Sequence, residues 1–240
     1  MSWVLLAVLV ALVLITLVFL RGSDLSAYDS PPGQSFDAGH EPSDEHDAVV
    51  ASLDVGIGPV RRAPRRKRLA LMREYMDSVS ETQDFHAEFT PVDAGGVPAE
   101  WVVTPGADSR RRVLYIHGGA FVMGSPVSHR NITSRFSEIA GAAVLAIDYR
   151  LMPEHRRMAG IQDCRTAYRW ILDNGPDGEH APDRLYVGGD SAGGNLTLST
   201  IAWVRDQSLR QPDGAVALSP ATDTTMGSPS LRHNMETDAM

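Results

Sequence analysis

The chain has 240 residues, of which 43% are hydrophobic and 22% are charged, and its formal net charge is −8. This composition is typical of a globular protein with one sizeable core, so it excludes disorder throughout the chain. The acidic balance excludes a nucleic-acid backbone as the expected partner, and the single cysteine, Cys164, excludes an internal disulfide.

The first 21 residues contain an uncharged apolar run from Trp3 to Leu20. As a helix, this run would be about 27 Å long, close to the thickness of the hydrocarbon core of a bilayer. We therefore expect a transmembrane anchor over residues 1–21 and a membrane-anchored protein, on a side of the membrane that the sequence leaves open. Secretion after cleavage of a signal peptide is the alternative, which is disfavoured because no Lys or Arg precedes the run.

Residues 22–60 are rich in Ser, Pro, Gly and acidic residues, and this composition predicts a flexible linker. His40 and His46 lie beside carboxylates there, but their spacing does not match a structural zinc motif. Residues 61–84 begin with the basic run RRAPRRKR and continue with apolar residues at helical spacing. We expect one amphipathic helix over residues 61–80 that acts as a cap or lid. Its basic run is interpreted as a solvated helix start, in preference to a contact with lipid headgroups.

From residue 85 onward, short apolar runs alternate with helical patterns. This alternation predicts an α/β fold with a mostly parallel sheet and helices on both faces. The expected strands are a hairpin of residues 86–91 and 99–104, followed by residues 113–116, 144–148, 185–188 and 216–218. The expected helices are residues 128–140, 162–174 and 192–206, with Gly141 and Gly175 as stops.

The sharpest motif is GDSAGG at residues 189–194, which follows the apolar run LYVG and opens a helix. A serine on a tight turn between a strand and a helix needs small neighbours two positions before and after it, and Gly189 and Gly193 provide them. We interpret Ser191 as a nucleophile, with Asp190 and Ala192 completing the turn. The backbone N–H of Ala192 then points toward developing negative charge. An ordinary helix-capping serine is the alternative, and a phosphate-binding loop is excluded because the ending G-K-[ST] is missing.

A second motif, HGGAF, follows the apolar run VLYI at residues 117–121. Glycine-rich loops of this type supply backbone N–H donors to an oxyanion hole. We expect donors at Gly118 and Gly119 in addition to Ala192, each stabilising the oxyanion by about 3 kcal/mol. His117 is interpreted as an organiser of the loop and not as a base.

Taken together, HGGAF, DYRLMPEH at residues 148–155 and GGDSAGGN at residues 188–195 resemble the hormone-sensitive-lipase-like family of α/β-hydrolases. The resemblance spans residues 85–240. It implies the α/β-hydrolase fold, hydrolysis of carboxylic esters by a Ser-Asp-His triad, oxyanion donors at the three positions given above, and no cofactor or metal. It also implies that Asp223 is a structural acid where the chain enters the cap.

The chain departs from the family pattern in two places. Residues 156–160, RRMAG, stand where the family has a proline-and-aromatic stretch, which puts local cap contacts in doubt. The family's triad acid and histidine lie further downstream than the residues after Ser191 reach, so residues 85–240 are expected to be a partial hydrolase domain that lacks both. His233 is not expected to replace the missing base, and His155 and His180 are interpreted as loop residues.

Two hypotheses therefore remain open. The first is a serine esterase or lipase that is inactive as this truncated chain. The second is a non-catalytic ligand-binding or interaction protein on the same scaffold, since function resides in the site and not in the fold. The sequence does not indicate an oligomeric state.

Overall fold

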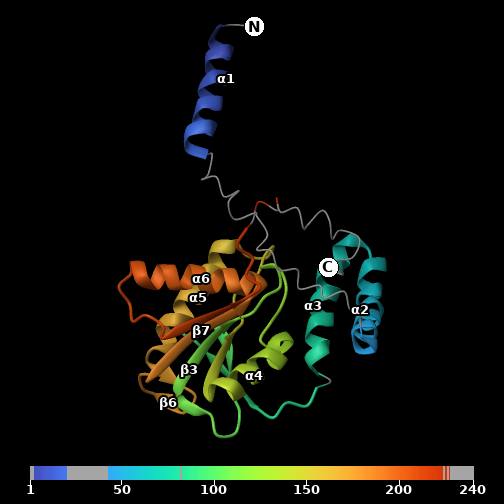
Figure 1. The fold of residues 1–240 in the computed structure, drawn as a ribbon, viewed down its shortest axis with the longest axis vertical. Helices are drawn as coiled ribbons and strands as arrows, with labels where there is room; N and C mark the ends of the chain where they lie inside the picture. The colour runs from blue at the N-terminus through green and yellow to red at the C-terminus, as the bar shows by residue number, and fades with distance from the viewer. Residues whose placement is uncertain (1–2, 21–42, 82, 224, 226, 228–240) are drawn as a thin grey trace. The chain divides into compact units, whose positions relative to one another are not determined.

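The computed structural model describes residues 3–20, 43–81, 83–223, 225 and 227 (Figure 1). The chain divides into one unit formed by residues 1–47 and 226–240 and a second formed by residues 48–225, and each is described by itself.

The prediction of a membrane anchor was wrong. The first α-helix, α1, covers only Trp3–Ile15, and a five-residue π-helical segment, η1, follows at Thr16–Leu20. Thirteen residues of α-helix are about 20 Å long, well short of the roughly 30 Å of a bilayer core. Within residues 3–20 and the rest of the described chain, no helix is long and apolar enough to cross a membrane.

The predicted linker and cap helix also differ from the structure. Helix α2 covers Asp44–Arg62 and helix α3 covers Arg65–Glu81, so part of the predicted linker is helical and the basic run bridges two helices. Ser43 starts α2 by accepting the backbone N–H of His46 on its hydroxyl, at 3.3 Å. Acidic residues fill the first turn of α2, where the helix dipole favours negative charge. Gly56, Gly58 and Pro59 obscure this helix in the sequence.

The remaining elements alternate between strands and helices, as the sequence predicted. The strands are β1 (Glu88–Asp93), β2 (Pro98–Val103), β3 (Asp108–Ile116), β4 (Ala142–Ile147), β5 (Asn174–Gly175), β6 (Gly178–Glu179), β7 (Arg184–Asp190) and β8 (Gly214–Leu218). The helices are the short 3-10 helix η3 (Val127–His129), α4 (Arg130–Ala140), α5 (Arg157–Ile171) and α6 (Ser191–Asp206). Gly141 ends α4 in the left-handed conformation, as expected, whereas Gly175 lies in the small hairpin of β5 and β6 and α5 ends before it.

Six strands form one mostly parallel sheet in the order β1-β2-β4-β3-β7-β8. The antiparallel hairpin of β1 and β2 forms one edge, while β4, β3, β7 and β8 run parallel to one another. Parallel neighbours bring the carboxyl ends of β3 and β7 together, with Ile116 opposite Gly189. The two motifs that follow these strands therefore start at the same edge of the sheet.

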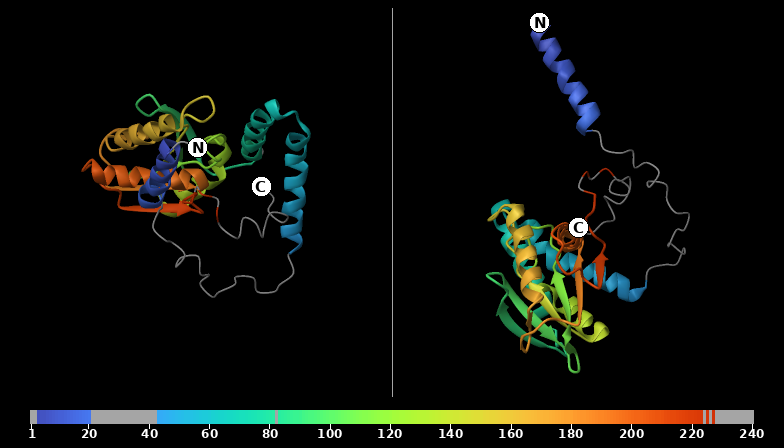
Figure 2. Two further views of the ribbon diagram at one scale, coloured as in Figure 1. Left: turned by 90° about the horizontal axis from the view of Figure 1, so that it is seen from above. Right: turned by 90° about the vertical axis from the view of Figure 1, so that its left-hand side faces the viewer.

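The two faces of the sheet bury alternate residues of the same strands. On one face, Leu114 and Leu145 pack with α5 and α6, whereas on the other face Val113 and Val144 pack with Phe136 of α4. Figures 1 and 2 show α5 and α6 together on one side of the sheet and α4 on the other. This arrangement confirms the predicted α/β architecture with helices on both faces. Strands buried on both faces explain why these runs are continuously apolar in the sequence.

We predict that Leu145→Ala lowers the free energy of unfolding by about 2–5 kcal/mol, because Leu145 is fully buried and its truncation leaves a cavity. Chemical denaturation of the variant measures this loss. Leu198→Ala is the matched control, since Leu198 is 44% exposed on α6 and its truncation should cost about 0.5 kcal/mol or less. Equal losses in the two variants would contradict the core described here.

Candidate active site

The turn between β7 and α6 holds Ser191 in an unusual backbone conformation. Asp190 is extended, with φ −114° and ψ 151°, and Ser191 has a φ of +49°, a region that side-chain-bearing residues rarely occupy. The serine is exposed although the three residues that follow it, Ala192, Gly193 and Gly194, are buried. The turn thus presents the Ser191 hydroxyl to solvent at the amino terminus of a helix, where unpaired N–H groups favour negative charge.

The glycines on either side of Ser191 are required by close packing. A Cβ atom at Gly189 would lie 2.5 Å from the carbonyl oxygen of Ile116, and one at Gly193 would overlap the carbonyl oxygens of Ile116 and His117. The turn between β7 and α6 therefore packs closely against the end of β3. Any larger residue at Gly189 or Gly193 would push the two motifs apart.

The loop after β3 turns sharply through residues with positive φ. The values are +113° at Gly119, +54° at Ala120 and +64° at Phe121. The carbonyl oxygen of Gly119 accepts the N–H groups of Val122 and Met123, at 3.0 and 2.9 Å. Within the described part of the chain, the backbone N–H groups of Gly119 and Ala120 have no hydrogen-bond partner. These two groups are therefore available to an incoming oxyanion.

Gly118 was expected to be an oxyanion donor, and its hydrogen bond argues for a different role. Its backbone N–H donates to Asp190 Oδ1 at 2.9 Å, so this N–H is already hydrogen-bonded and is not free to bind an oxyanion. A Cβ atom at Gly118 would also collide with the Asp190 carboxylate. The loop therefore offers Gly119 and Ala120 as donors, one residue further along than the sequence suggested.

Asp190 links the two motifs through three partners. Its Oδ1 atom accepts the Tyr115 hydroxyl at 2.8 Å and the Gly118 N–H, and His129 Nε2 lies 3.5 Å away. Burial alone would raise the pKa of Asp190, but His129, the Tyr115 hydroxyl and the Gly118 N–H together hold that pKa below its ordinary value. The carboxylate therefore stays ionised. The contacts of Tyr115 and His129 could not be predicted, because strand and helix periodicity does not reveal which side chains converge on one carboxylate.

His117 organises the loop and remains neutral. It is almost fully buried, donates its Nδ1–H to the Gly118 carbonyl at 2.7 Å, and stacks on Tyr149 at 4.4 Å between ring centroids. Burial, reinforced by the nearby His129, lowers the pKa of His117 to about 3. Tyr149 in turn donates its hydroxyl to the carbonyl oxygen of His117 at 3.0 Å.

The DYRLMPEH segment supports this loop from behind and connects it to α3. The N–H of Met152 donates to the carbonyl oxygen of Phe121 at 2.9 Å. Arg73 of α3 bonds to both carboxylate oxygens of Glu154 at 2.9 Å and also donates to the carbonyl oxygens of Met152 and Val122. One arginine therefore holds α3 against both loops, a contact that the sequence did not reveal.

No residue among those described accepts the proton of the Ser191 hydroxyl. His180 contacts Arg112 and Asp177, and His155 lies in the loop that follows DYRLMP. Asp223 accepts hydrogen bonds from Thr225, while His233 lies outside the described residues.

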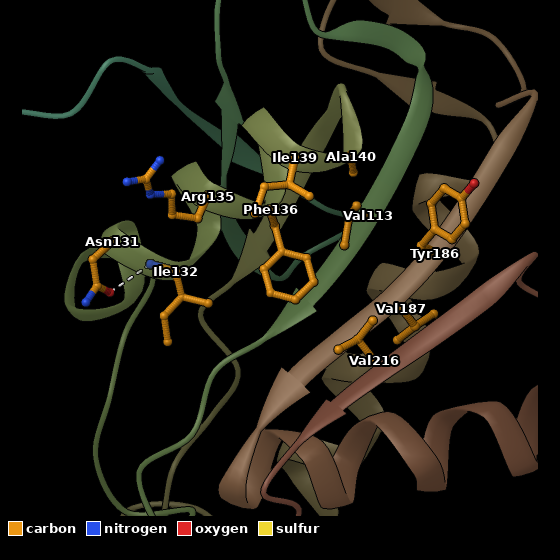
Figure 3. Close-up of a pocket in the computed structure, with 10 residues that line it drawn as sticks. All are labelled: Val113, Asn131, Ile132, Arg135, Phe136, Ile139, Ala140, Tyr186, Val187 and Val216. Atoms are coloured by element: carbon orange, nitrogen blue, oxygen red, sulfur yellow. Dashed lines mark hydrogen bonds between the residues drawn. The ribbon is translucent and has the colours of Figure 1, made fainter.

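The described residues contain no group of three or more His, Cys, Asp or Glu side chains that could hold a metal ion. A groove of about 510 Å³ opens instead between α4 and the strands β3, β7 and β8 (Figure 3). Phe136 of α4 and Val187 and Val216 of the strands line it, so the groove is apolar. None of its lining residues belongs to the two motifs.

Comparisons with known proteins agree with this geometry. A model of the α/β-hydrolase fold matches residues 113–240. An acetyl-hydrolase of Streptomyces hygroscopicus is 41% identical over 132 residues, which are 55% of this chain and 42% of that protein. The carboxylesterase/phospholipase LipF of Mycobacterium tuberculosis is 37% identical over 63% of this chain and 40% of its own length. The chain therefore spans less than half the length of these two curated relatives.

Solved structures show the same relationship. An esterase of the bacterial hormone-sensitive lipase family superposes with a TM-score of 0.70 at 32% identity, over 83% of this chain and 65% of that one. An esterase/lipase from an uncultured bacterium gives the same TM-score at 36% identity.

The burial of His117 predicts a loss of stability in acid. Its pKa is about 3 in the folded protein against an ordinary value of 6.5, so only the unfolded chain takes up a proton as the pH falls below 6.5. This group should therefore lower the free energy of unfolding by up to about 1.4 kcal/mol per pH unit as the pH falls toward about 4. Urea denaturation across this pH range measures the slope. In His117→Gln the slope should be shallower by this amount, and an unchanged slope would contradict the prediction.

Proposed function

Because the chain belongs to the α/β-hydrolase family and is similar to esterases of the hormone-sensitive lipase family, we propose that it supplies the nucleophile and oxyanion hole of a carboxylic-ester hydrolase. One observation carries the proposal. Ser191 has a φ of +49° between two closely packed glycines, at the sheet edge where a neighbouring loop leaves two N–H groups unpaired. An ordinary capping serine needs neither the strained turn nor that loop.

In the proposed reaction, the Ser191 hydroxyl oxygen attacks the acyl carbon of the ester and gives its proton to a base. The carbonyl oxygen of the substrate becomes a tetrahedral oxyanion, which accepts hydrogen bonds from the N–H groups of Gly119, Ala120 and Ala192. Each such donor stabilises the transition state by about 3 kcal/mol. The alcohol leaves with a proton, and water then releases the acyl group from the serine.

We propose that the base and its acid come from a part of the protein outside the described residues. The two described histidines nearest the motifs already have other roles, since His117 is buried and neutral and His129 faces Asp190. The described residues alone are therefore expected to be inactive. Within them, α3 is the proposed cap element, because Arg73 connects it to the loops on either side of the site.

The proposed substrate is a small carboxylic ester. Ala120 and Ser191 are both exposed, so the acyl carbon can reach the serine without a large movement of the described loops. The name of the mycobacterial relative, carboxylesterase/phospholipase, extends the candidate substrates to esters that carry a phosphate group.

A binding protein on the same scaffold is the second candidate. It is favoured by the absence, among the described residues, of any proton acceptor for the Ser191 hydroxyl. In that case the two free N–H groups would bind an anion without catalysing a reaction.

We predict that Ser191→Ala lowers kcat for p-nitrophenyl butyrate by about 10⁴-fold or more, because no other group can form the acyl intermediate. The assay uses the 240-residue chain beside the product of the complete open reading frame, and hydrolysis is expected in the form that includes the base. Ser199→Ala is the matched control, since Ser199 lies on the same helix and bonds to the carbonyl oxygen of Asn195. Hydrolysis that survives Ser191→Ala would refute the proposed nucleophile, and no hydrolysis by any form would favour the binding protein.

A further inference from the structure

Two adjacent arginines, Arg156 and Arg157, stand at the start of α5, where the chain departs from the pattern of the family it resembles. Arg156 precedes the helix in an extended conformation and Arg157 is its first residue. Both side chains are exposed. Cations at this end of a helix are unfavourable, because the helix dipole is positive there, and the first turn of α5 has no acidic residue.

Arg157 reaches the immediate surroundings of Ser191. Its guanidinium carbon lies 4.2 Å from the centroid of the Phe121 ring, and its Nη2 donates to Asn195 Oδ1 at 2.9 Å. Phe121 directly follows Ala120 of the oxyanion loop. Asn195 lies four residues after Ser191, so the two share one face of α6. The guanidinium therefore lies between the oxyanion loop and the first turn of the nucleophile helix.

Arg157 is held in place by Asn195, which is linked to Ser191 through Ala221. Asn195 Nδ2 donates to the carbonyl oxygen of Ala221 at 2.8 Å, and the N–H of Ala221 donates to the carbonyl oxygen of Ser191 at 2.9 Å. Stacking on Phe121 and the bond to Asn195 orient the guanidinium plane. A guanidinium has five N–H donors, and the described residues use one of those on Arg157.

The positive charge of these two arginines is not balanced locally. Nine of the seventeen other arginines of the larger unit form ion pairs with carboxylates, namely Arg73, Arg110, Arg111, Arg130, Arg135, Arg150, Arg184, Arg205 and Arg210. Within the described chain, neither Arg156 nor Arg157 lies within ion-pair distance of a carboxylate. A protein with a net charge of −8 thus keeps two unpaired cations and the amino terminus of a helix at one side of this site.

We propose that Arg157 selects esters that carry an anionic group, a carboxylate or a phosphate, on the part of the substrate that lies over Phe121 and Asn195. The inference rests on the proposed hydrolase function and names the substrate class of the same site. The remaining N–H donors of Arg157 form charge-assisted hydrogen bonds to the anion, and the planar fork suits both carboxylate and phosphate oxygens. Because the side chain is exposed, the expected preference is about three- to tenfold and decreases as salt is added.

The first arm of the test measures hydrolysis by the product of the complete open reading frame, the form that is expected to include the base. Values of kcat/KM are compared for p-nitrophenyl butyrate and mono-p-nitrophenyl glutarate, and for glycerol monobutyrate and the butyryl ester of glycerol 3-phosphate. In Arg157→Gln, the ratio of the anionic to the neutral ester should fall three- to tenfold, and Arg157→Lys should fall between Gln and wild type. Arg111→Gln is the matched control: it removes the same charge at the opposite end of β3 from the site. Its ratio should equal that of wild type.

The second arm does not depend on turnover. Glutarate and glycerol 3-phosphate are titrated into the full chain, and Kd is measured by NMR. Arg157→Gln should weaken binding three- to tenfold for at least one of the two anions, and Arg111→Gln should not. Whichever anion responds identifies the carboxylate or the phosphate as the preferred group.

The two arms separate the possible failures. Hydrolysis of neutral esters together with ratios and Kd values that do not respond to Arg157→Gln would overturn the inference and leave the hydrolase function in place. Arg157-dependent binding without any hydrolysis would reject the hydrolase function and support the anion site. Absence of both hydrolysis and Arg157-dependent binding would reject both.

Discussion

The carboxylate of Asp190 is the interaction on which the arrangement of the site depends. It follows β7, yet it binds the hydroxyl of Tyr115 on β3 and the N–H of Gly118 in the loop after β3. Ser191 is the next residue in the chain, so the group that fixes the loop after β3 is covalently joined to the proposed nucleophile. A half-buried carboxylate is costly unless its oxygens are hydrogen-bonded, and here the bonds that reduce this cost also set the spacing of the two motifs.

Because of this arrangement, the residues of the loop after β3 have different roles. Gly118 gives its N–H to the scaffold, His117 fills the space beneath the loop, and the next two residues keep their N–H groups free. The positive φ values at Ala120 and Ser191 are strained, and strain of this kind persists only where the surrounding structure holds the backbone in place. Preorganised donors of this kind lose little energy to reorientation when charge develops in the substrate.

The sequence predicted the fold well where one physical pattern dominated. Continuous apolar runs indicated β3, β4 and β7 because these strands are buried on both faces, and Gly189 and Gly193 indicated the elbow because no Cβ fits there. It failed at α2, where glycines and Pro59 hide a capped helix, and at α1, where apolar composition alone suggested a full membrane span. The roles of Gly118, Arg73 and Arg157 could not be predicted, since each depends on contacts between segments far apart in the chain.

The strand β8 has a consequence for how the protein behaves in solution. Among the described strands it pairs only with β7, it carries no charged residue, and Val216 and Leu218 are 44% and 39% exposed beside the apolar groove. An uncharged open strand accepts the backbone of any other extended segment, including the same strand of another molecule. Such an edge favours association between molecules, so we expect the particle size in a sample to depend on protein concentration. Dilution series are as necessary as substrate series for interpreting measurements on it.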